Sequence, residues 1–233
     1  MALFPRYEES DDEFVGGSDA ATRALSVAVV ETDFVEAVYK KIASVYDYTF
    51  GPTLHPGRLT AIRRLGAKSG DHILEVGVGT GINLPLYPSG CRLTGVDLST
   101  SMLLKARNRV LRCGVRDARL LQMDAAAMTF PDNTFDIVYA PYLISVVPDP
   151  VKVASEMVRV CRMGGRIVVL NHFRSSNRLV SLVERAITPF TVHIGFKSDL
   201  DLPGFLTQAH LQPDSIEKVN IPRIWSLVTI VKR

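Results

Sequence analysis

The sequence predicts an α/β fold with a doubly wound, mostly parallel sheet that ends in an antiparallel pair of strands. Strand-like apolar runs alternate with helical segments through the central part of the chain, and this alternation indicates parallel strands joined by crossover helices. The run 166–170 is almost entirely apolar, as is typical of a strand covered on both faces. The last two strand-like segments, 215–221 and 225–232, are separated by only three residues, which permits a hairpin but no parallel crossover.

Seven strands and helices on both faces of the sheet are therefore expected. The parallel strands are predicted over 72–76, 92–97, 119–123, 135–140 and 166–170. The helices of this region are predicted over 57–65, 101–112, 150–161, 179–187 and 204–211. Ser99 or Thr100 and Asp149 stand where N-caps are needed, and Gly164-Gly165 is expected to stop the helix that begins at Pro150.

The N-terminal part differs from the rest in composition. It carries six acidic residues against Arg6 before residue 23, which indicates a disordered acidic tail. An apolar spacing of three to four residues then predicts a helix over about 24–48, and Phe50-Gly51-Pro52 is expected to break it. The predicted organisation is a tail at 1–22, a helical appendage covering the cleft at 23–66, and the α/β domain at 67–233 with a substrate-side insertion at 174–205.

The composition excludes several classes of protein. Of the 233 residues, 47% are hydrophobic and 22% are charged, as expected of one folded domain with an appendage. The three cysteines are scattered, so neither a disulfide framework nor a metal site is expected. No apolar run approaches the roughly 18 residues that span a bilayer, and Met1 to Asp19 lacks the layout of a signal peptide. The expected location is cytoplasmic.

A glycine-rich turn follows the first predicted strand. It reads Gly77-x-Gly79-x-Gly81 after Glu75, and such a turn lets the backbone approach a ligand closely. Asp97 ends the next strand about 20 positions later, where an acidic side chain can accept ribose hydroxyls. The pattern predicts a ligand containing a nucleoside. A nicotinamide dinucleotide, or a tight turn without a ligand, is the alternative interpretation.

Together with the antiparallel end of the sheet, these residues resemble the class I S-adenosylmethionine-dependent methyltransferases over about residues 71–232. The resemblance implies a Rossmann-like seven-stranded sheet, S-adenosylmethionine as methyl donor and S-adenosylhomocysteine as product. It implies that Glu75 lies near the methionine amino group, that the three glycines line the methionine moiety, and that Asp97 binds the ribose. Further cofactor-binding residues are implied at Tyr39, Leu98, Met102, Met123, Asp124, Ala125 and Ala140. For Asp124, a helix cap before Ala125 is the alternative to an adenine contact.

A closer resemblance lies outside the glycine loop. It is carried by Tyr39-x-x-x-Ala43-x-x-Tyr46-Asp47-x-x-Phe50-Gly51-Pro52, Leu84-Pro85-Leu86-Tyr87, Ala140-Pro141-Tyr142-Leu143-Ile144-Ser145-Val146-Val147-Pro148-Asp149-Pro150 and Leu170-Asn171-His172-Phe173. Together these segments are similar to the bacterial phosphatidylethanolamine N-methyltransferases that are soluble and associate with membranes. The resemblance implies methylation of the phosphatidylethanolamine amine toward phosphatidylcholine. The stretch 174–200, which should contact the substrate, departs most from the family pattern.

Three residues are candidates for the chemistry on the acceptor. His172 ends the fifth strand, where an imidazole can take a proton near neutral pH or hold a phosphate. Tyr46 and Tyr142 can offer aromatic faces to a methylated ammonium. A buried, satisfied histidine and ordinary cleft-wall tyrosines are the alternatives. Cations of the insertion that can meet a lipid phosphate, or simply form solvated surface, are Arg178, Arg185 and Lys197.

The expected partners follow from charge and from the family resemblance. The net charge is +3 although the tail is acidic, so the remainder is basic and suits an anionic membrane surface, or is simply solvated. Lys40 and Lys41 flank the apolar face of the helix 24–48, as in an interfacial helix. The phospholipid enzyme would then lie peripherally on the inner membrane. Rivals are a methyltransferase of quinone precursors or another small hydrophobic acceptor, and a non-catalytic cofactor-binding membrane adaptor; no nucleic-acid partner is expected.

Overall fold

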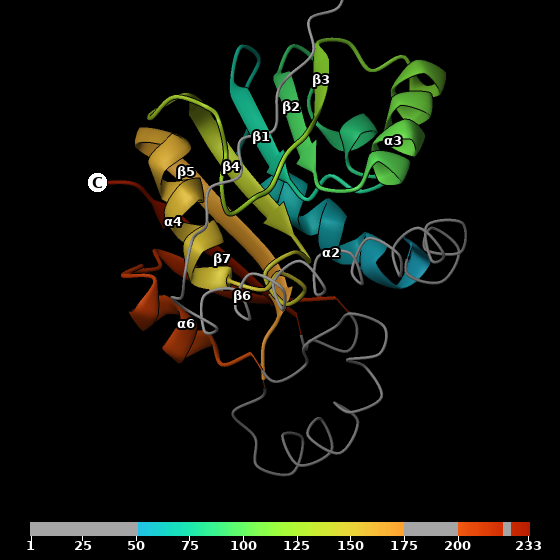
Figure 1. The fold of residues 1–233 in the computed structure, drawn as a ribbon. Coiled ribbons are helices and arrows are strands. Elements are labelled where there is room, and N and C mark those ends of the chain that lie inside the picture. Colours follow the sequence, from blue (N-terminus) through green and yellow to red (C-terminus); the bar gives the residue numbers. More distant parts are fainter. Residues whose placement is uncertain (1–50, 175–199, 221–224) are drawn as a thin grey trace, which may run out of the picture. The chain divides into compact units, whose positions relative to one another are not determined.

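The computed structural model describes residues 51–174, 200–220 and 225–233 (Figure 1). The acidic tail, the helix predicted over 24–48 and the helix predicted over 179–187 lie outside the described residues. The described part contains every predicted strand except residue 221, the last residue of the strand predicted over 215–221.

Seven strands form one sheet in the order β3-β2-β1-β4-β5-β7-β6. Their bounds are β1 (His72–Val76), β2 (Arg92–Asp97), β3 (Ala118–Gln122), β4 (Phe135–Pro141), β5 (Cys161–His172), β6 (Ser215–Val219) and β7 (Trp225–Val231). Neighbouring strands from β3 to β5 are parallel, whereas β7 is antiparallel to both β5 and β6. The predicted fold class, including the antiparallel end, is confirmed.

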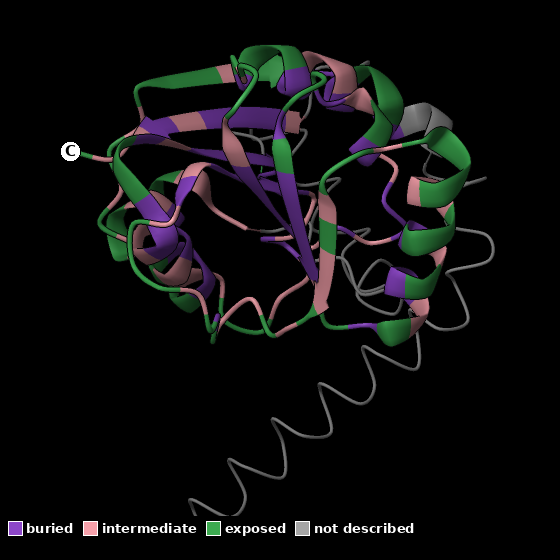
Figure 2. Ribbon diagram, turned by 90° about the horizontal axis from the view of Figure 1, so that it is seen from above, coloured by how far each residue is buried: buried purple, intermediate pink, exposed green. Residues whose placement is uncertain are grey.

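Helices cover both faces of the sheet (Figures 1 and 2). The helices are α2 (Gly51–Arg64), α3 (Thr100–Cys113), α4 (Pro150–Val160) and α6 (Leu202–Gln208), with a 3₁₀ turn η1 (Leu84–Leu86). Side chains of β1 alternate between the two faces: Ile73 packs with α2 and α3, whereas Leu74 and Val76 pack with α4 and α6. This alternation buries both faces of the central strands in apolar layers.

Side-chain caps fix three of the helix starts. Ser99 accepts a hydrogen bond from the Met102 amide at 3.4 Å, and Asp149 accepts one from the Lys152 amide at 2.9 Å. Asp201 accepts one from the Gly204 amide at 2.8 Å, so α6 begins at Leu202 rather than at the predicted 204. Each cap satisfies an amide that has no partner inside its own helix.

The prediction that Gly164-Gly165 stops a helix is wrong. Helix α4 ends at Val160, and β5 begins at Cys161 without a loop. The β4–β5 register shifts between Phe135 and Ile137, so the glycines lie in a bulge of β5. Gly164 has φ +71°, and a Cβ at Gly165 would lie 2.9 Å from the Asp136 carbonyl oxygen. The pair is needed because the bulge brings the two backbones close together.

The predicted start of the helix before the sheet is also wrong. Helix α2 runs from Gly51 to Arg64 rather than starting at residue 57, so it includes Gly51 and Pro52. Proline is tolerated in a first helical turn because the amide it lacks has no intrahelical acceptor there. Pro56 lies inside α2 and its carbonyl accepts a hydrogen bond from the Thr60 hydroxyl at 2.9 Å.

Candidate active site

The five parallel strands end at one edge of the sheet, where β1 has neighbours that continue in opposite directions along the sheet. In open α/β sheets, ligands bind in the crevice at such a switch point. The predicted residues Glu75, Asp97, Met123, Tyr142 and His172 all stand at or directly after the ends of these strands. The topology therefore brings the main predicted site residues of the domain to one edge.

The glycine loop and Asp97 form a shared backbone cradle. The Gly79 amide donates to Asp97 Oδ2 at 2.8 Å, and the Ser99 amide donates to Asp97 Oδ1 at 2.9 Å. Gly77, Gly79 and Gly81 all have positive φ, which favours glycine. A Cβ at Gly79 would meet nothing within 4 Å, whereas one at Gly77 would lie 2.8 Å from the Leu143 side chain. The space beside Gly79 and Asp97 thus suits the sugar and methionine parts of a nucleoside cofactor.

Burial changes the ionisation of Asp97. It raises the pKa of this carboxyl, and the hydrogen bonds from the Ser99 and Gly79 amides oppose the rise. Each carboxylate oxygen still has a second acceptor position, because each accepts one amide in this geometry. Asp97 can therefore accept hydroxyl groups without giving up its contacts to the loop.

Glu75 is a buried carboxyl with two neutral donors. Its side chain is 2% exposed; Oε1 accepts from Asn83 Nδ2 at 2.7 Å and Oε2 accepts from the Tyr87 hydroxyl at 2.5 Å. Burial raises the pKa of Glu75 to about 7, although these hydrogen bonds and the charge of Arg58 lower it. A carboxyl whose pKa is held near 7 by these opposing effects can bind a cationic group with only a small change in its own protonation.

Asn83 and Tyr87 are not among the site residues predicted from the sequence, although Tyr87 belongs to a segment that carries the family resemblance. They stand four positions apart around η1, directly after the glycine loop. A pair of hydrogen-bonding side chains one helical turn apart, following a buried acid and a glycine loop, is the signal that could have identified them.

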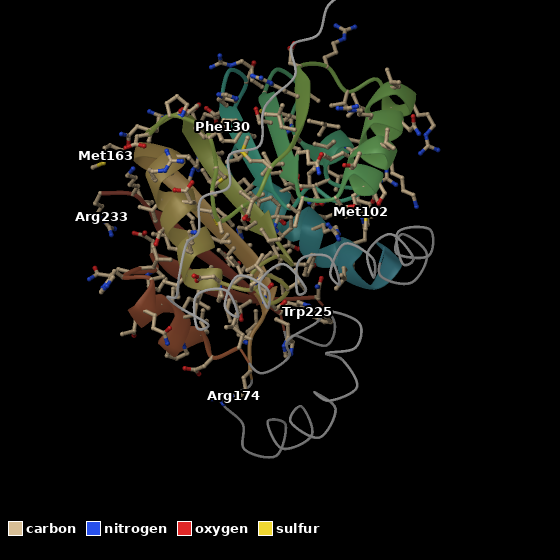
Figure 3. The ribbon with its side chains drawn as sticks, viewed as in Figure 1. Met102, Phe130, Met163, Arg174, Trp225 and Arg233 are labelled. Carbon is tan, nitrogen blue, oxygen red and sulfur yellow. The ribbon has the colours of Figure 1, made fainter. Side chains whose placement is uncertain are left out.

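The ends of β2 and β3 form the side expected to hold adenine. The Met123 amide donates to the Asp97 carbonyl at 3.1 Å, which joins the two strand ends. Met102 is buried at the start of α3 (labelled in Figure 3), and Leu98 is 37% exposed. Asp124 is exposed and accepts from the Ala126 amide at 2.8 Å, which is the local turn contact weighed against an adenine role. Ala125 beside it is half-buried.

Tyr142 lies at the end of β4 in an unusual backbone conformation. Its φ is +57°, and its amide donates to the Leu170 carbonyl at 2.6 Å. Its hydroxyl donates to the Leu54 carbonyl and accepts from Asn220 Nδ2, both at 3.1 Å. Ala140, two residues earlier, is fully buried in the layer under α4 and α6. The Tyr142 ring is therefore fixed between β4, α2 and the end of β6.

Arg58 of α2 covers Tyr142 and was not selected from the sequence. Its guanidinium carbon lies 4.8 Å from the centroid of the Tyr142 ring, which is a cation–π geometry. Nη1 of Arg58 donates to Asn83 Oδ1 at 3.4 Å. The local sequence around Arg58 does not predict these contacts, because Tyr142 and Asn83 are distant from it in the chain.

His172 ends β5 and is buried. It is 5% exposed, and its ring packs edge-to-face on Trp225, the residue paired with it in β7, with ring centroids 6.1 Å apart. Trp225 is labelled in Figure 3. The preceding Asn171 accepts from the Ser145 amide and hydroxyl and donates to the His172 carbonyl at 2.7 Å. The imidazole therefore has a fixed place at the edge of the sheet.

The remaining predicted site residues lie outside the described part of the chain. They are Tyr39, Tyr46, Arg178, Arg185 and Lys197. Within the described ranges, no cluster of three or more His, Cys, Asp or Glu side chains is arranged to hold a metal ion. No helix in those ranges is both long enough and apolar enough to cross a bilayer.

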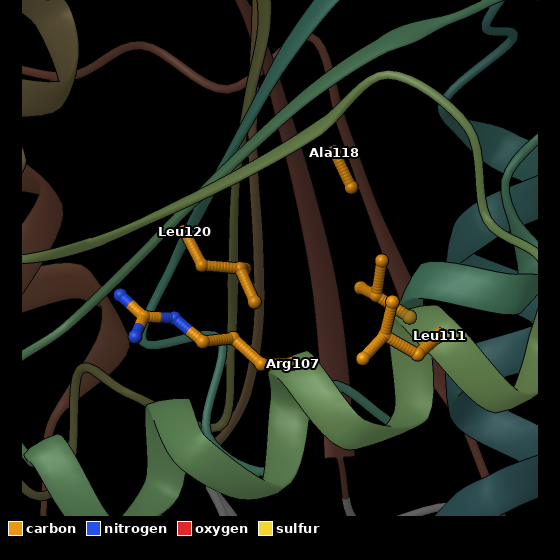
Figure 4. Close-up of a pocket in the computed structure, with 5 residues that line it drawn as sticks. Arg107, Leu111, Ala118 and Leu120 are labelled. Carbon is orange, nitrogen blue, oxygen red and sulfur yellow. The ribbon is translucent and has the colours of Figure 1, made fainter.

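A shallow groove of about 290 Å³ lies between α3 and β3 (Figure 4). Its walls come from Arg107, Val110, Leu111, Ala118 and Leu120. Ala118 is the first residue of β3 and Leu111 belongs to the last turn of α3. The groove therefore lies toward the amino end of β3, away from the edge that carries Asp97 and the glycine loop.

Comparisons with known proteins show that this chain is similar to methyltransferases. Residues 74–169 match a family described as a methyltransferase domain. The chain is 44% identical over 184 residues to a phosphatidylethanolamine N-methyltransferase of Cereibacter sphaeroides, covering 78% of this chain and 90% of that protein. It is 32% identical to a ubiquinone/menaquinone biosynthesis C-methyltransferase of Bdellovibrio bacteriovorus, covering 59% of this chain and 61% of that protein.

A solved structure shows the same fold. Phosphoethanolamine N-methyltransferase 2 of Haemonchus contortus, solved with phosphomonomethylethanolamine and S-adenosylhomocysteine, superimposes with a TM-score of 0.70 at 19% identity. The match covers 87% of this chain and 60% of that one. At this identity the likeness concerns the fold alone.

Proposed function

Because this chain belongs to the class I S-adenosylmethionine-dependent methyltransferases, we propose that it methylates the amine of phosphatidylethanolamine toward phosphatidylcholine. The observation that carries the proposal is the 44% identity to the phosphatidylethanolamine N-methyltransferase of Cereibacter sphaeroides, in a match that covers 90% of that protein. The quinone-methylating relative is less similar, with 32% identity over 61% of its length. A quinone precursor is therefore the second candidate acceptor.

In the proposed cofactor site, the methionine part lies along the glycine loop and its ammonium faces Glu75. The ribose hydroxyls bind Asp97, and the adenine lies against Leu98 and Met102 with Met123, Asp124 and Ala125 at its edge. The open space at Gly79 and the second acceptor positions of Asp97 support this arrangement. Tyr39 and Ala140 are further proposed contacts at the methionine end.

When bound, S-adenosylmethionine supplies a methyl group that its sulfonium already activates. The protein then contributes mainly by holding the acceptor about 3 Å from that methyl group in line with the breaking bond. The acceptor amine has to lose its proton before it can attack, and we propose His172 as the group that accepts the proton or fixes the lipid phosphate.

Two aromatic side chains are proposed to surround the acceptor ammonium. Tyr142, at the end of β4, and Tyr46 would each supply an aromatic ring face. Arg178, Arg185 and Lys197 are proposed to bind the lipid phosphate. The membrane is proposed to be reached from the helical appendage 23–66, with the enzyme lying peripherally on the anionic inner membrane.

The proposal is tested by supplying methyl-labelled S-adenosylmethionine with vesicles that contain phosphatidylethanolamine and, separately, with a demethylated quinone. We expect label in mono- and dimethylated phosphatidylethanolamine. Label confined to the quinone would replace the phospholipid by the second candidate. Tight cofactor binding without label in any acceptor would instead indicate the non-catalytic adaptor.

A matched pair of variants controls this experiment. Asp97→Asn should reduce labelling, because the ribose loses its charged acceptor. Asp117→Asn should not, because Asp117 is exposed at the opposite end of β3 and its positive φ suits asparagine equally well. Equal loss in both variants would point to instability rather than to cofactor binding.

A further inference from the structure

Arg58 is a buried cation with few hydrogen-bond partners among the described residues. Its side chain is 6% exposed, and its Nε has no hydrogen-bond partner. Its hydrogen bond to Asn83 Oδ1 is long, at 3.4 Å; its guanidinium also lies over the Tyr142 ring, and its charge acts on the buried Glu75. A guanidinium carries five N–H donors, so most of the hydrogen-bonding capacity of Arg58 is unused by the described residues.

Such a group is costly unless an anion completes it. A buried charge loses its hydration, and protein interiors compensate by pairing it with an opposite charge and filling its hydrogen bonds. Cation–π contact with Tyr142 offsets only part of this loss. An anionic ligand that reaches Arg58 would therefore complete it.

Glu75 lies one side chain away from Arg58. Asn83 joins the two, because its Nδ2 donates to Glu75 Oε1 at 2.7 Å while its Oδ1 accepts from Arg58. A single amide side chain therefore separates a carboxylate from a guanidinium. This pair is complementary to a zwitterion whose ammonium and carboxylate share one carbon, because the carboxylate of the protein can bind the ammonium and the guanidinium can bind the carboxylate. The α-amino acid end of the cofactor is such a group.

We propose that Arg58 binds the α-carboxylate of the methionine moiety while Glu75 binds its α-ammonium. The inference rests on the proposed role of Glu75 in the cofactor site and is independent of the acceptor. Stacking on Tyr142 and the contact to Asn83 fix the plane of the guanidinium, which suits the two-pronged recognition of a carboxylate. Arg58 thus adds an α2 residue to a site otherwise built from strand ends.

A lipid phosphate is the other oxyanion that such an arginine could hold. The connection through Asn83 to Glu75 favours the methionine carboxylate, because it ties Arg58 to the glycine-loop side of the site. The two sources differ in a measurable way, since one changes cofactor affinity and the other changes the use of lipid.

The test compares S-adenosylmethionine with its decarboxylated analogue, which keeps the ammonium and the sulfonium. By isothermal titration calorimetry, the wild-type protein should bind the carboxylated ligand at least about 20-fold more tightly, as expected for hydrogen bonds between charged groups. In Arg58→Met the two affinities should lie within about 3-fold of each other. Arg107→Met, an exposed arginine of α3 far from the site, should keep the wild-type preference.

Three results would overturn the proposal. Equal weakening of both ligands in Arg58→Met would make Arg58 a structural support for Tyr142 and Asn83. Unchanged affinity for both, with a raised KM for phosphatidylethanolamine vesicles, would assign Arg58 to the lipid phosphate. A wild-type protein that binds the two ligands equally would exclude a carboxylate site altogether.

Two further variants keep the test informative. If Arg58→Met does not fold, Arg58→Lys keeps the charge but lacks the planar fork, and its preference for the carboxylated ligand should fall about 5-fold; full wild-type preference would count against the proposal. Glu75→Gln should weaken both ligands while keeping the preference, because both carry the ammonium. Loss of the ammonium contact and loss of the carboxylate contact are therefore distinguishable.

Discussion

Replacing Glu75 by glutamine should stabilise the protein at pH 8 while weakening its hold on the cofactor. Folding raises the pKa of Glu75 from its ordinary value of 4.5 to about 7 because the carboxyl is buried. A carboxyl with a raised pKa lowers the stability of the fold only at pH values where the same carboxyl is ionised in the unfolded chain. For Glu75 this loss of stability is absent at low pH, grows above pH 4.5 and is complete above about pH 7. Glutamine has nearly the same shape and no charge to desolvate.

The size of the effect follows from the two pKa values. A change in pKa from 4.5 to about 7 corresponds to about 3 kcal/mol in the free energy of unfolding at pH 8, and to about 1 kcal/mol at pH 5. For a domain of this size, about 3 kcal/mol corresponds to a rise of roughly 6–12 °C in Tm. The neighbours permit the exchange, because glutamine can accept from Asn83 and donate to the Tyr87 hydroxyl oxygen.

Thermal unfolding of both proteins, followed by circular dichroism at pH 5 and pH 8, measures this difference. The advantage of Glu75→Gln should be large at pH 8 and should fall to about a third of that value at pH 5. Glu217→Gln, which removes an exposed carboxylate paired with Arg64, should change Tm little at either pH. If Glu75→Gln is less stable than wild type at pH 8, or its advantage does not depend on pH, the assigned ionisation of Glu75 is refuted.

Cofactor binding gives the complementary measurement. If only ionised Glu75 holds the ammonium, wild-type affinity should rise about eightfold from pH 5.5 to pH 6.5, in proportion to the ionised fraction of a carboxyl with pKa about 7. Most of that rise should be missing in Glu75→Gln. Calorimetric titration at the two pH values reads this directly.

Three other changes separate cofactor binding, turnover and folding. Asp97→Asn should weaken S-adenosylmethionine binding by roughly 10-fold or more, because ribose hydroxyls lose a charged acceptor; unchanged affinity by calorimetry would remove Asp97 from the site. His172→Ala should lower turnover on phosphatidylethanolamine vesicles far more than cofactor affinity, and wild-type turnover would make His172 a structural residue. Gly165→Ala should lower the free energy of unfolding in urea by about 1–3 kcal/mol, because its Cβ would lie 2.8 and 2.9 Å from two carbonyl oxygens. Gly114→Asn should cost less, since Gly114 has open space, and equal costs would contradict the packing argument.

The strand ends were predictable because their signals are local. An apolar run, a following glycine loop and an acid after the next strand are visible within short windows of sequence, and parallel pairing then brings them to one edge. Asp97 and Gly79 illustrate this, since the hydrogen bond between them follows from the β1–β2 register. The same locality explains why the antiparallel β6–β7 pair could be expected from a three-residue gap.

The errors arose where one local signal has two structural meanings. Gly164-Gly165 has the composition of a helix stop, yet the structure uses the pair for a bulge that lets β5 start directly after α4. The helix α2 begins at Gly51 rather than at the predicted residue 57, because proline in a first turn is compatible with a helix. Choosing between the meanings requires the partner strand or the packing of the helix, which no short window contains.

Tyr142 shows why the polar cluster around it could not be predicted. A tyrosine at φ +57° costs roughly 1–2 kcal/mol relative to an ordinary backbone conformation, and three contacts from distant segments hold it there. Its amide binds the Leu170 carbonyl, while its hydroxyl binds the Leu54 carbonyl and Asn220. Gly57 makes room for Asn220, because a Cβ there would lie 2.2 Å from Asn220 Oδ1.

This strained turn has a consequence for the site. Backbone strain persists where surrounding contacts over-determine it, and such places are often functional. Here the contacts fix the ring on which the Arg58 guanidinium lies, and through Asn83 the same arginine is connected to Glu75. The cost of the Tyr142 conformation is therefore tied to the orientation of the buried Arg58 guanidinium beside the proposed methionine site. Arg58→Met should leave Tyr142 in its turn, since the hydrogen bonds to Leu170, Leu54 and Asn220 do not involve Arg58, and the loss of carboxylate recognition would then be separable from any loss of structure.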